Sequence, residues 1–223
     1  MSTIIHYRPL VPGNEPIVYP TSDGRPTGET DLHRMVMVQA IDVLTRYYAG
    51  QPVYVSGNLL LYYEQFNKRR HLSPDVLVTK GIPPGSRPYY LLWDEGAPPN
   101  LVIEVTSAST RSEDLDQKLQ LYRDVILVRE YFLFDPLGEY LVPPLQGYRL
   151  EAGAYVPIAP LNGRLPSLET GLYLEKVDAQ LRFYNPATSS WLLSTAEHLE
   201  QSTEEIARLR QELENLRQSK SNG

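Results

Sequence analysis

The chain has 223 residues, a formal net charge of −6 and no cysteine. The absence of cysteine excludes disulfides, thiolate-bound zinc and cysteine nucleophiles, so any metal ion must be held by oxygen or imidazole ligands. No stretch contains the roughly 20 apolar residues that a membrane-spanning helix requires, and the polar N-terminal residues show no secretory apolar segment. We therefore expect a soluble, cytoplasmic protein.

The negative net charge opposes strong non-specific binding of nucleic acid, because such binding draws its affinity from lysine and arginine contacts to phosphates. Local basic clusters nevertheless occur at Lys68-Arg69-Arg70-His71 and around Arg111 and Lys118. Each cluster is either a contact surface for nucleic acid or ordinary solvated surface, and the sequence leaves both interpretations open.

The predicted elements begin after an irregular leader, residues 1–28, which is rich in proline and glycine and has no sustained apolar period. A first helix is predicted from the N-cap candidate Thr30 to Gly50, a candidate for the C′ position, because apolar residues recur at helical spacing between them. Short apolar runs then predict strands of one sheet, at residues 53–55, 59–63, 76–78 and 101–103.

A second helix is predicted over residues 113–123, followed by a strand over 131–134. The link between them, residues 124–128, lacks the glycine that usually ends a helix before a buried strand. Further short runs predict a β-rich C-terminal extension of the same domain, at residues 139–142, 147–150, 172–174, 181–184 and 191–193. These elements place one α/β (α+β) domain at residues 29–194.

The C-terminal residues 195–223 differ in kind, because apolar residues alternate there in steps of three and four between Glu, Arg and Gln. This pattern predicts a helix and a short coiled coil. The repeat covers about two and a half heptads with one polar position, so it favours pairing with a partner chain, and a homodimer is the expected assembly. A frayed, solvated helix is the alternative.

Two carboxylates stand out by their context. Asp75 follows Pro74 at the start of an apolar run, and Glu104 interrupts the run of residues 101–105, which is apolar enough to be buried on both faces. A buried acid is costly unless a cation or a hydrogen-bond donor neutralises it, and two converging acids need one even more. The alternatives are that Asp75 caps a turn and that Glu104 pairs with Arg111.

Oxygen ligands from Asp75 and Glu104, with the carbonyl of Val105, suit Mg²⁺, with Mn²⁺ as the alternative ion. Mg²⁺ accepts phosphate oxygens, so the fitting reaction is hydrolysis of a phosphodiester bond. A lysine is expected beside such a site to balance the remaining charge, and Lys118 on the second helix is the candidate. Its alternative role is an i, i+4 ion pair with Asp114. No nucleophile elbow, phosphate-binding glycine loop or dinucleotide fingerprint is present.

An ordered set of motifs resembles the putative restriction endonuclease family of the PD-(D/E)XK nuclease superfamily over roughly residues 20–194. The motifs are Pro74-Asp75, Ile103-Glu104-Val105 with Thr106-Ser107-Ala108-Ser109-Thr110, then Asp116, Lys118 and Tyr122, and Glu130-Tyr131-Phe132-Leu133-Phe134-Asp135-Pro136. The resemblance implies a restriction-endonuclease-like mixed β-sheet flanked by helices, with a divalent-metal nuclease core.

By this resemblance Asp75 and Glu104 are the metal ligands, and Glu29, at the entrance to the first helix, is an additional catalytic acid. His33 lies one turn after Glu29 and is placed to line the same cleft. The standard superfamily pattern has a lysine two residues after the second acid, where this chain has Thr106, and Lys118 on the following helix takes that role.

The sequence thus predicts a Mg²⁺-dependent endonuclease that acts on nucleic acid, with DNA as the expected substrate and Asp75, Glu104, Lys118 and Glu29 as catalytic residues. The competing hypothesis is a catalytically inactive nuclease-fold module that acts in nucleic-acid binding or assembly through its C-terminal helix. Thr106 and the net charge of −6 favour this second hypothesis.

Overall fold

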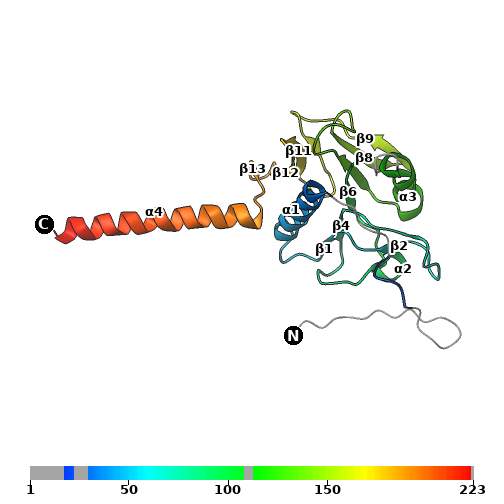
Figure 1. Ribbon diagram of the computed structural model, residues 1–223, viewed down its shortest axis with the longest axis horizontal. Helices are drawn as coiled ribbons and strands as arrows, with labels where there is room; N and C mark the ends of the chain where they lie inside the picture. Colours follow the sequence, from blue (N-terminus) through cyan, green and yellow to red (C-terminus); the bar gives the residue numbers. More distant parts are fainter. Residues whose placement is uncertain (1–17, 23–29, 108–112, 222–223) are drawn as a thin grey trace.

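A mixed six-stranded sheet forms the centre of the computed structural model, which describes residues 18–22, 30–107 and 113–221 (Figure 1). The parallel pair β6–β7 lies in the middle of this sheet, and its other neighbouring strands are antiparallel. In spatial order the strands are β1 (Val53–Ser56), β4 (Val76–Lys80), β6 (Leu101–Val105), β7 (Glu130–Phe134), β8 (Leu145–Glu151) and β9 (Ala154–Pro157).

The two central strands, β6 and β7, are buried along their whole length, as the apolar run at 101–105 predicts. Side chains of a strand alternate between its two faces. Leu101, Ile103 and Val105 therefore enter one hydrophobic core, whereas Val102 enters the core on the opposite face. Glu104 shares the face of Val102, so the position of this acid follows from the period of the strand.

Helix α1 (Asp31–Tyr47) covers the first of these faces. Its N-cap is Thr30, whose side chain accepts a hydrogen bond from the His33 N–H at 3.2 Å, as predicted. The helix buries one side, with Val36, Met37, Ala40, Val43 and Leu44 against the sheet. It ends at Tyr47, three residues before Gly50, so Gly50 follows the cap instead of occupying the C′ position.

A helical segment over residues 113–126 covers the opposite face, and its first and last turns are π-helical: η1 (Glu113–Lys118), α3 (Leu119–Leu121) and η2 (Tyr122–Ile126). It extends three residues beyond the predicted end at 123. Leu127, with φ +63°, ends it in the left-handed conformation that glycine usually supplies. The missing glycine in this link is thus replaced by a strained leucine.

The expectation that the runs at 53–55, 59–63, 76–78 and 101–103 form one sheet is wrong for the run at 59–63. A separate three-stranded sheet contains β3 (His71–Leu72), β2 (Leu61–Tyr62) and β5 (Tyr90–Leu91), which leads into α2 (Leu92–Glu95). On one side this sheet packs on a small core of its own, in which Tyr19 and Tyr62 are buried together, whereas Leu61, Leu72 and Tyr90 join a core of the central sheet. The short apolar run at 59–63 predicted a strand, but such a run does not determine which strand is its neighbour.

The C-terminal β-rich extension is present, because β8 and β9 extend the central sheet and a four-stranded antiparallel sheet follows. The latter contains β10 (Leu165–Pro166), β11 (Tyr173–Val177), β12 (Gln180–Asn185) and β13 (Ser190–Trp191), and it packs on α1. The predicted strand at 139–142 is wrong. Buried Asp135 accepts the backbone N–H groups of Leu137, Gly138, Tyr140 and Leu141, which folds this segment into a loop.

The last element is α4 (Thr195–Ser221), a single long helix that extends away from the sheets (Figure 1). It confirms the helix predicted for the C-terminal residues. No helix in the described part of the chain combines the length and the apolarity needed to cross a membrane. Most of the predicted leader, and with it the candidate Glu29, lies outside the described residues, as does Arg111.

Candidate active site

The two carboxylates singled out by the sequence lie next to each other in the fold. Asp75 immediately precedes β4, and its Oδ2 accepts a hydrogen bond of 2.7 Å from the backbone N–H of Val105, the residue that follows Glu104 in β6. The two partners are 30 residues apart in the chain. Asp75 is therefore held in place by the antiparallel pair β4–β6. The alternative role, in which Asp75 caps a local turn, does not account for this long-range hydrogen bond.

The second oxygen of Asp75 faces α1. Its Oδ1 lies 3.1 Å from Nε2 of His33, a residue in the first turn of that helix, and both side chains are nearly buried. His33 and Val105, the two partners of Asp75, also line a small cavity of about 60 Å³ with Thr106 and Ser107. The structure thus places His33 beside Asp75, whereas a cleft that His33 shares with Glu29 stays a prediction.

Glu104 is fully buried, and donors reach both of its carboxylate oxygens. Lys118 Nζ lies 3.0 Å from Oε2, and the Tyr122 hydroxyl donates a 2.6 Å hydrogen bond to Oε1. Both donors come from the helical segment that covers this face of the sheet. The structure thus brings Lys118 to Glu104, although 14 residues separate them in the chain.

A third carboxylate, Asp114, completes the cluster. Its Oδ1 lies 2.9 Å from Lys118 Nζ, and its side chain is almost completely buried. Asp114, Lys118 and Tyr122 are spaced four residues apart, so they lie on one side of the helical segment. The i, i+4 ion pair and the contact with Glu104 therefore both occur, and Lys118 bridges the two acids. Sequence reasoning treated Asp114 only as a competing partner, although its spacing pointed to the same face.

The electrostatics of this cluster are dominated by burial and by excess negative charge. Burial raises the pKa of Glu104 to about 8, with Asp75 and Asp114 adding to the rise against Lys118 and Tyr122. Burial lowers the pKa of Lys118, but the surrounding carboxylates raise it by more, so the net direction is upward. Lys118 is therefore held as a cation by the acids around it.

This donor set fits a divalent cation. When the carboxylates of Glu104 and Asp114 are ionised, two negative charges contact the single positive charge of Lys118, and the nearby carboxylate of Asp75 adds a third, which leaves a formal excess of two. Within the described residues, no three His, Asp or Glu side chains converge closely enough to form a complete ligand set. Mg²⁺ does not need one, because it is commonly bound through one or two carboxylates and keeps several waters.

Thr106 occupies the position where the superfamily pattern has lysine. Its side chain is buried, and its Oγ1 makes no hydrogen bond within the described residues. A threonine there contributes no positive charge, and Lys118 supplies the only lysine contact to Glu104 that the described residues show. Val105 contributes its N–H to Asp75, whereas a ligand role for its carbonyl stays a prediction.

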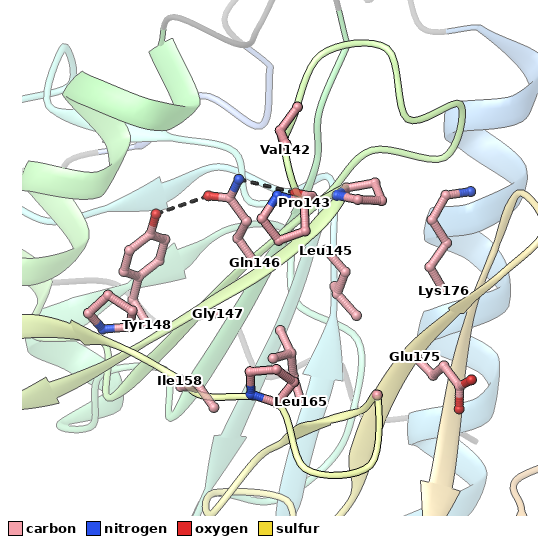
Figure 2. Close-up of a pocket in the computed structure, with 14 residues that line it drawn as sticks. Val142, Pro143, Leu145, Gln146, Gly147, Tyr148, Ile158, Leu165, Glu175 and Lys176 are labelled. Atoms are coloured by element: carbon pink, nitrogen blue, oxygen red, sulfur yellow. Dashed lines mark hydrogen bonds between the residues drawn. The ribbon is translucent and has the colours of Figure 1, made fainter.

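A separate, mainly apolar cavity lies where β8 and β9 approach the four-stranded sheet (Figure 2). It has a volume of about 490 Å³ and is lined mainly by proline, leucine and isoleucine side chains. Its charged residues are already engaged: Glu175 binds Arg164, and Lys176 Nζ donates to the carbonyl of Pro136. None of Asp75, Glu104 and Lys118 lines it, so it lacks the chemistry that the carboxylate cluster offers.

No curated protein matches the chain. Among solved structures, the chain is similar to a putative nuclease belonging to DUF820 from Anabaena variabilis, with a TM-score of 0.46 and 14% identity, covering 70% of this chain and 79% of that one. The model of the Uma2 family, described as "Putative restriction endonuclease", matches residues 17–179, well over half of the sequence. The chain therefore belongs to the Uma2 family of putative restriction endonucleases.

Proposed function

We propose that this protein is a Mg²⁺-dependent endonuclease that hydrolyses phosphodiester bonds in DNA. The observation that carries the proposal is the buried cluster in which Lys118 lies between Glu104 and Asp114, next to Asp75. Membership in a family of putative restriction endonucleases supports nuclease activity. Asp75 and Glu104 are proposed as the metal ligands, and Glu29 as an additional acid from outside the described residues.

Each proposed ligand is oriented by its neighbours before any ion binds. The Val105 N–H and His33 fix the Asp75 carboxylate, and Tyr122 fixes Glu104 through its hydroxyl. Pre-oriented ligands reduce the reorganisation that binding requires. When bound, Mg²⁺ supplies Lewis-acid polarisation of the phosphoryl group and lowers the pKa of its water.

Lys118 is proposed to stabilise the negative charge that grows on the phosphate during hydrolysis. A fixed ammonium in a water-excluded site acts more strongly than the same charge in solvent. Asp114 and Glu104 keep its Nζ in place and keep it protonated. Lys118 thereby takes the part that a lysine at position 106 takes in the standard pattern, and Asp114 is a positioning residue for it.

DNA binding is proposed to involve the loop between β2 and β3. Lys68, Arg69 and Arg70 are exposed there, and the exposed Phe66 precedes them with φ +66°, a conformation that is rare for a phenylalanine. Cations beside an exposed aromatic ring suit a phosphate backbone and a base face. The same chain segment continues through β3 to Asp75, which connects this loop directly to the proposed site.

A non-catalytic nuclease-fold module is the second candidate. The observation that favours it is Thr106, which leaves the usual lysine position without a charge. Such a protein would keep the fold and bind nucleic acid or a partner without cleaving. Measurements of metal binding and of DNA cleavage distinguish the two candidates, because only the nuclease is expected to show both.

The test is calorimetric titration of Mg²⁺ and Mn²⁺ into the wild type, Asp75→Asn and Glu104→Gln, followed by nicking of supercoiled plasmid under the same conditions. We expect both variants to lose metal binding and nicking while remaining folded by circular dichroism. Glu175→Gln removes a partly buried carboxylate far from the cluster and serves as the matched control. A folded wild type that neither binds metal nor nicks DNA would refute the nuclease and support the non-catalytic module.

A further inference from the structure

One side of α4 exposes apolar side chains in a regular row. Leu199, Ile206, Leu209, Leu213 and Leu216 are each between 49% and 67% exposed, and they recur in steps of three and four when Ser202 is included. This places Leu199, Ile206 and Leu213 at heptad position a, and Ser202, Leu209 and Leu216 at position d. Such a row on a projecting helix points to a partner that covers it.

The base of α4 is tied to the rest of the protein, so the direction of the helix is defined. Ser194 and Glu197 form a reciprocal capping box, and Arg182 of β12 pairs with Glu197. Asp42 of α1 accepts hydrogen bonds of 2.6 Å from both the N–H and the hydroxyl of Thr195. The exposed row therefore begins immediately beyond a firmly attached first turn.

Charged residues flank the row in an ordered way. Position g carries Glu205 and Glu212, and position e carries Arg210 and Arg217. In a parallel, in-register pair, each g residue faces the e residue of the next heptad on the other helix. Glu205 then meets Arg210 of the second copy, and Glu212 meets its Arg217. In an antiparallel pair, g meets g and e meets e, so glutamate would face glutamate and arginine would face arginine.

We propose that α4 forms a parallel, in-register, two-stranded coiled coil with a second copy of this chain. The partner is a second copy of this chain because the charges at positions e and g of α4 complement those of an identical helix. They do so only when the two helices run parallel. The exposed ion pair between Arg208 and Glu205 within one helix contributes little to stability. It therefore does not compete strongly with ion pairs between the two helices. Because the repeat is short and contains Ser202, the dimer dissociates on dilution.

The parallel orientation determines where the two catalytic domains lie relative to each other, and the importance of their position for DNA cleavage rests on the proposed nuclease function. A parallel coil places both catalytic domains at its N-terminal end, whereas an antiparallel one would separate them by up to about 40 Å, the length of a helix of 27 residues at about 1.5 Å per residue. Two domains at one end can engage the two strands of one duplex. The dimer itself requires neither metal nor DNA, so its test is independent of nuclease activity.

The first experiment is sedimentation equilibrium of the full chain over a range of concentrations. We expect a monomer–dimer equilibrium whose dissociation constant rises at least about tenfold in Arg210→Glu/Arg217→Glu, because glutamate then faces glutamate. Exchanging all four charges, with Glu205→Arg and Glu212→Arg added, restores the dimer. The control is Arg69→Glu/Arg70→Glu, which makes the same change in net charge in the loop between β2 and β3, outside α4. This variant is expected to leave the dimer intact.

The second experiment uses the absence of cysteine from the chain. Leu216→Cys lies near the C-terminal end of the row, so mild oxidation links two copies only if the helices run parallel and in register. Gln218→Cys, on the outer side of the helix, is the matched control and does not crosslink. A wild type that stays monomeric at every concentration, or a dimer that Leu216→Cys fails to link and that Arg210→Glu/Arg217→Glu leaves unchanged, would overturn the proposal.

Discussion

Gly57 lies against the backbone of Asp75 so closely that a Cβ at position 57 would be 1.9 Å from the Asp75 carbonyl oxygen. The same Cβ would also lie 2.9 Å from the end of the Ile41 side chain. Glycine at this position therefore allows the segment after β1 to pack directly beneath the proposed metal ligand.

From this contact we predict that Gly57→Ala displaces Asp75. The substitution should lower the free energy of unfolding by about 1–3 kcal/mol, the usual cost of overpacking, and weaken Mg²⁺ binding in calorimetric titration. Gly50→Ala is the control, since Gly50 has φ +80° but nothing within 4 Å of the added Cβ. That variant should lose about 1–2 kcal/mol of stability, the cost of a left-handed conformation for alanine, and bind Mg²⁺ normally. Unchanged metal affinity in Gly57→Ala would contradict the prediction.

Lys118→Met tests the contribution of the Lys118 ammonium group to stability and to nicking. Removing the ammonium leaves Glu104 and Asp114 buried without their cation, which should cost about 3–5 kcal/mol of stability in the absence of metal. Nicking should fall at least about 100-fold, whereas Mg²⁺ binding should persist and raise the melting temperature more than in the wild type. Asp114→Asn, which keeps Lys118 but loosens its position, should show a smaller loss of nicking. Wild-type nicking by Lys118→Met would exclude the proposed role.

The Tyr122 hydroxyl is predicted to matter through Glu104. Tyr122→Phe removes the donor to a fully buried carboxylate oxygen and should cost about 1–3 kcal/mol. It should also weaken Mg²⁺ binding, because Glu104 loses one of its two orienting contacts. Tyr131→Phe is matched in size and burial, but its hydroxyl donates to the Asp114 backbone carbonyl, so metal affinity should change less. Equal effects of both variants on metal affinity would argue against a specific contribution from Tyr122.

Glu169 gives a pH-dependent contribution to stability. Burial raises the pKa of Glu169, but Lys80, Asn100 and Arg129 together lower it by more, so the folded-state pKa lies below the usual value. A carboxylate with a lowered pKa stabilises the fold above its unfolded pKa and loses that contribution as the pH falls through the folded one. Glu169→Gln should therefore be less stable than the wild type at pH 7 by about 1 kcal/mol, with the difference closing below about pH 4.5. A difference that persists at low pH in urea unfolding would contradict this.

The loop between β2 and β3 is predicted to contact DNA phosphates. Replacing Lys68, Arg69 and Arg70 by alanine should reduce the slope of log K against log salt by about 2–3 in a fluorescence anisotropy titration with duplex DNA. Arg123→Ala removes a partly exposed arginine that already pairs with Asp124 and is the control. An unchanged slope in the triple variant would place the DNA surface elsewhere. Phe66→Ala should lower affinity at all salt concentrations, because a stacking contact is not electrostatic.

The sequence by itself determined the elements whose signals are local. The cap at Thr30, the buried run at 101–105 and the heptads after 195 follow from side-chain chemistry and periodicity over a few residues. The two-residue period of a strand also requires Glu104 and Ile103 to lie on opposite faces. An acid inside a buried strand was recognisable as a candidate because its burial is costly in any fold.

Only the tertiary structure decided which groups meet that acid. The contact of Asp75 with Val105 and that of Lys118 with Glu104 depend on strand pairing and on the docking of a helix, and neither leaves a local pattern. The same reason explains why the strand at 61–62 joined a separate sheet, and why Asp135 turned the segment after β7 into a loop. Periodicity specifies which face of an element is buried, whereas contacts between distant residues are selected by the packing of the whole chain.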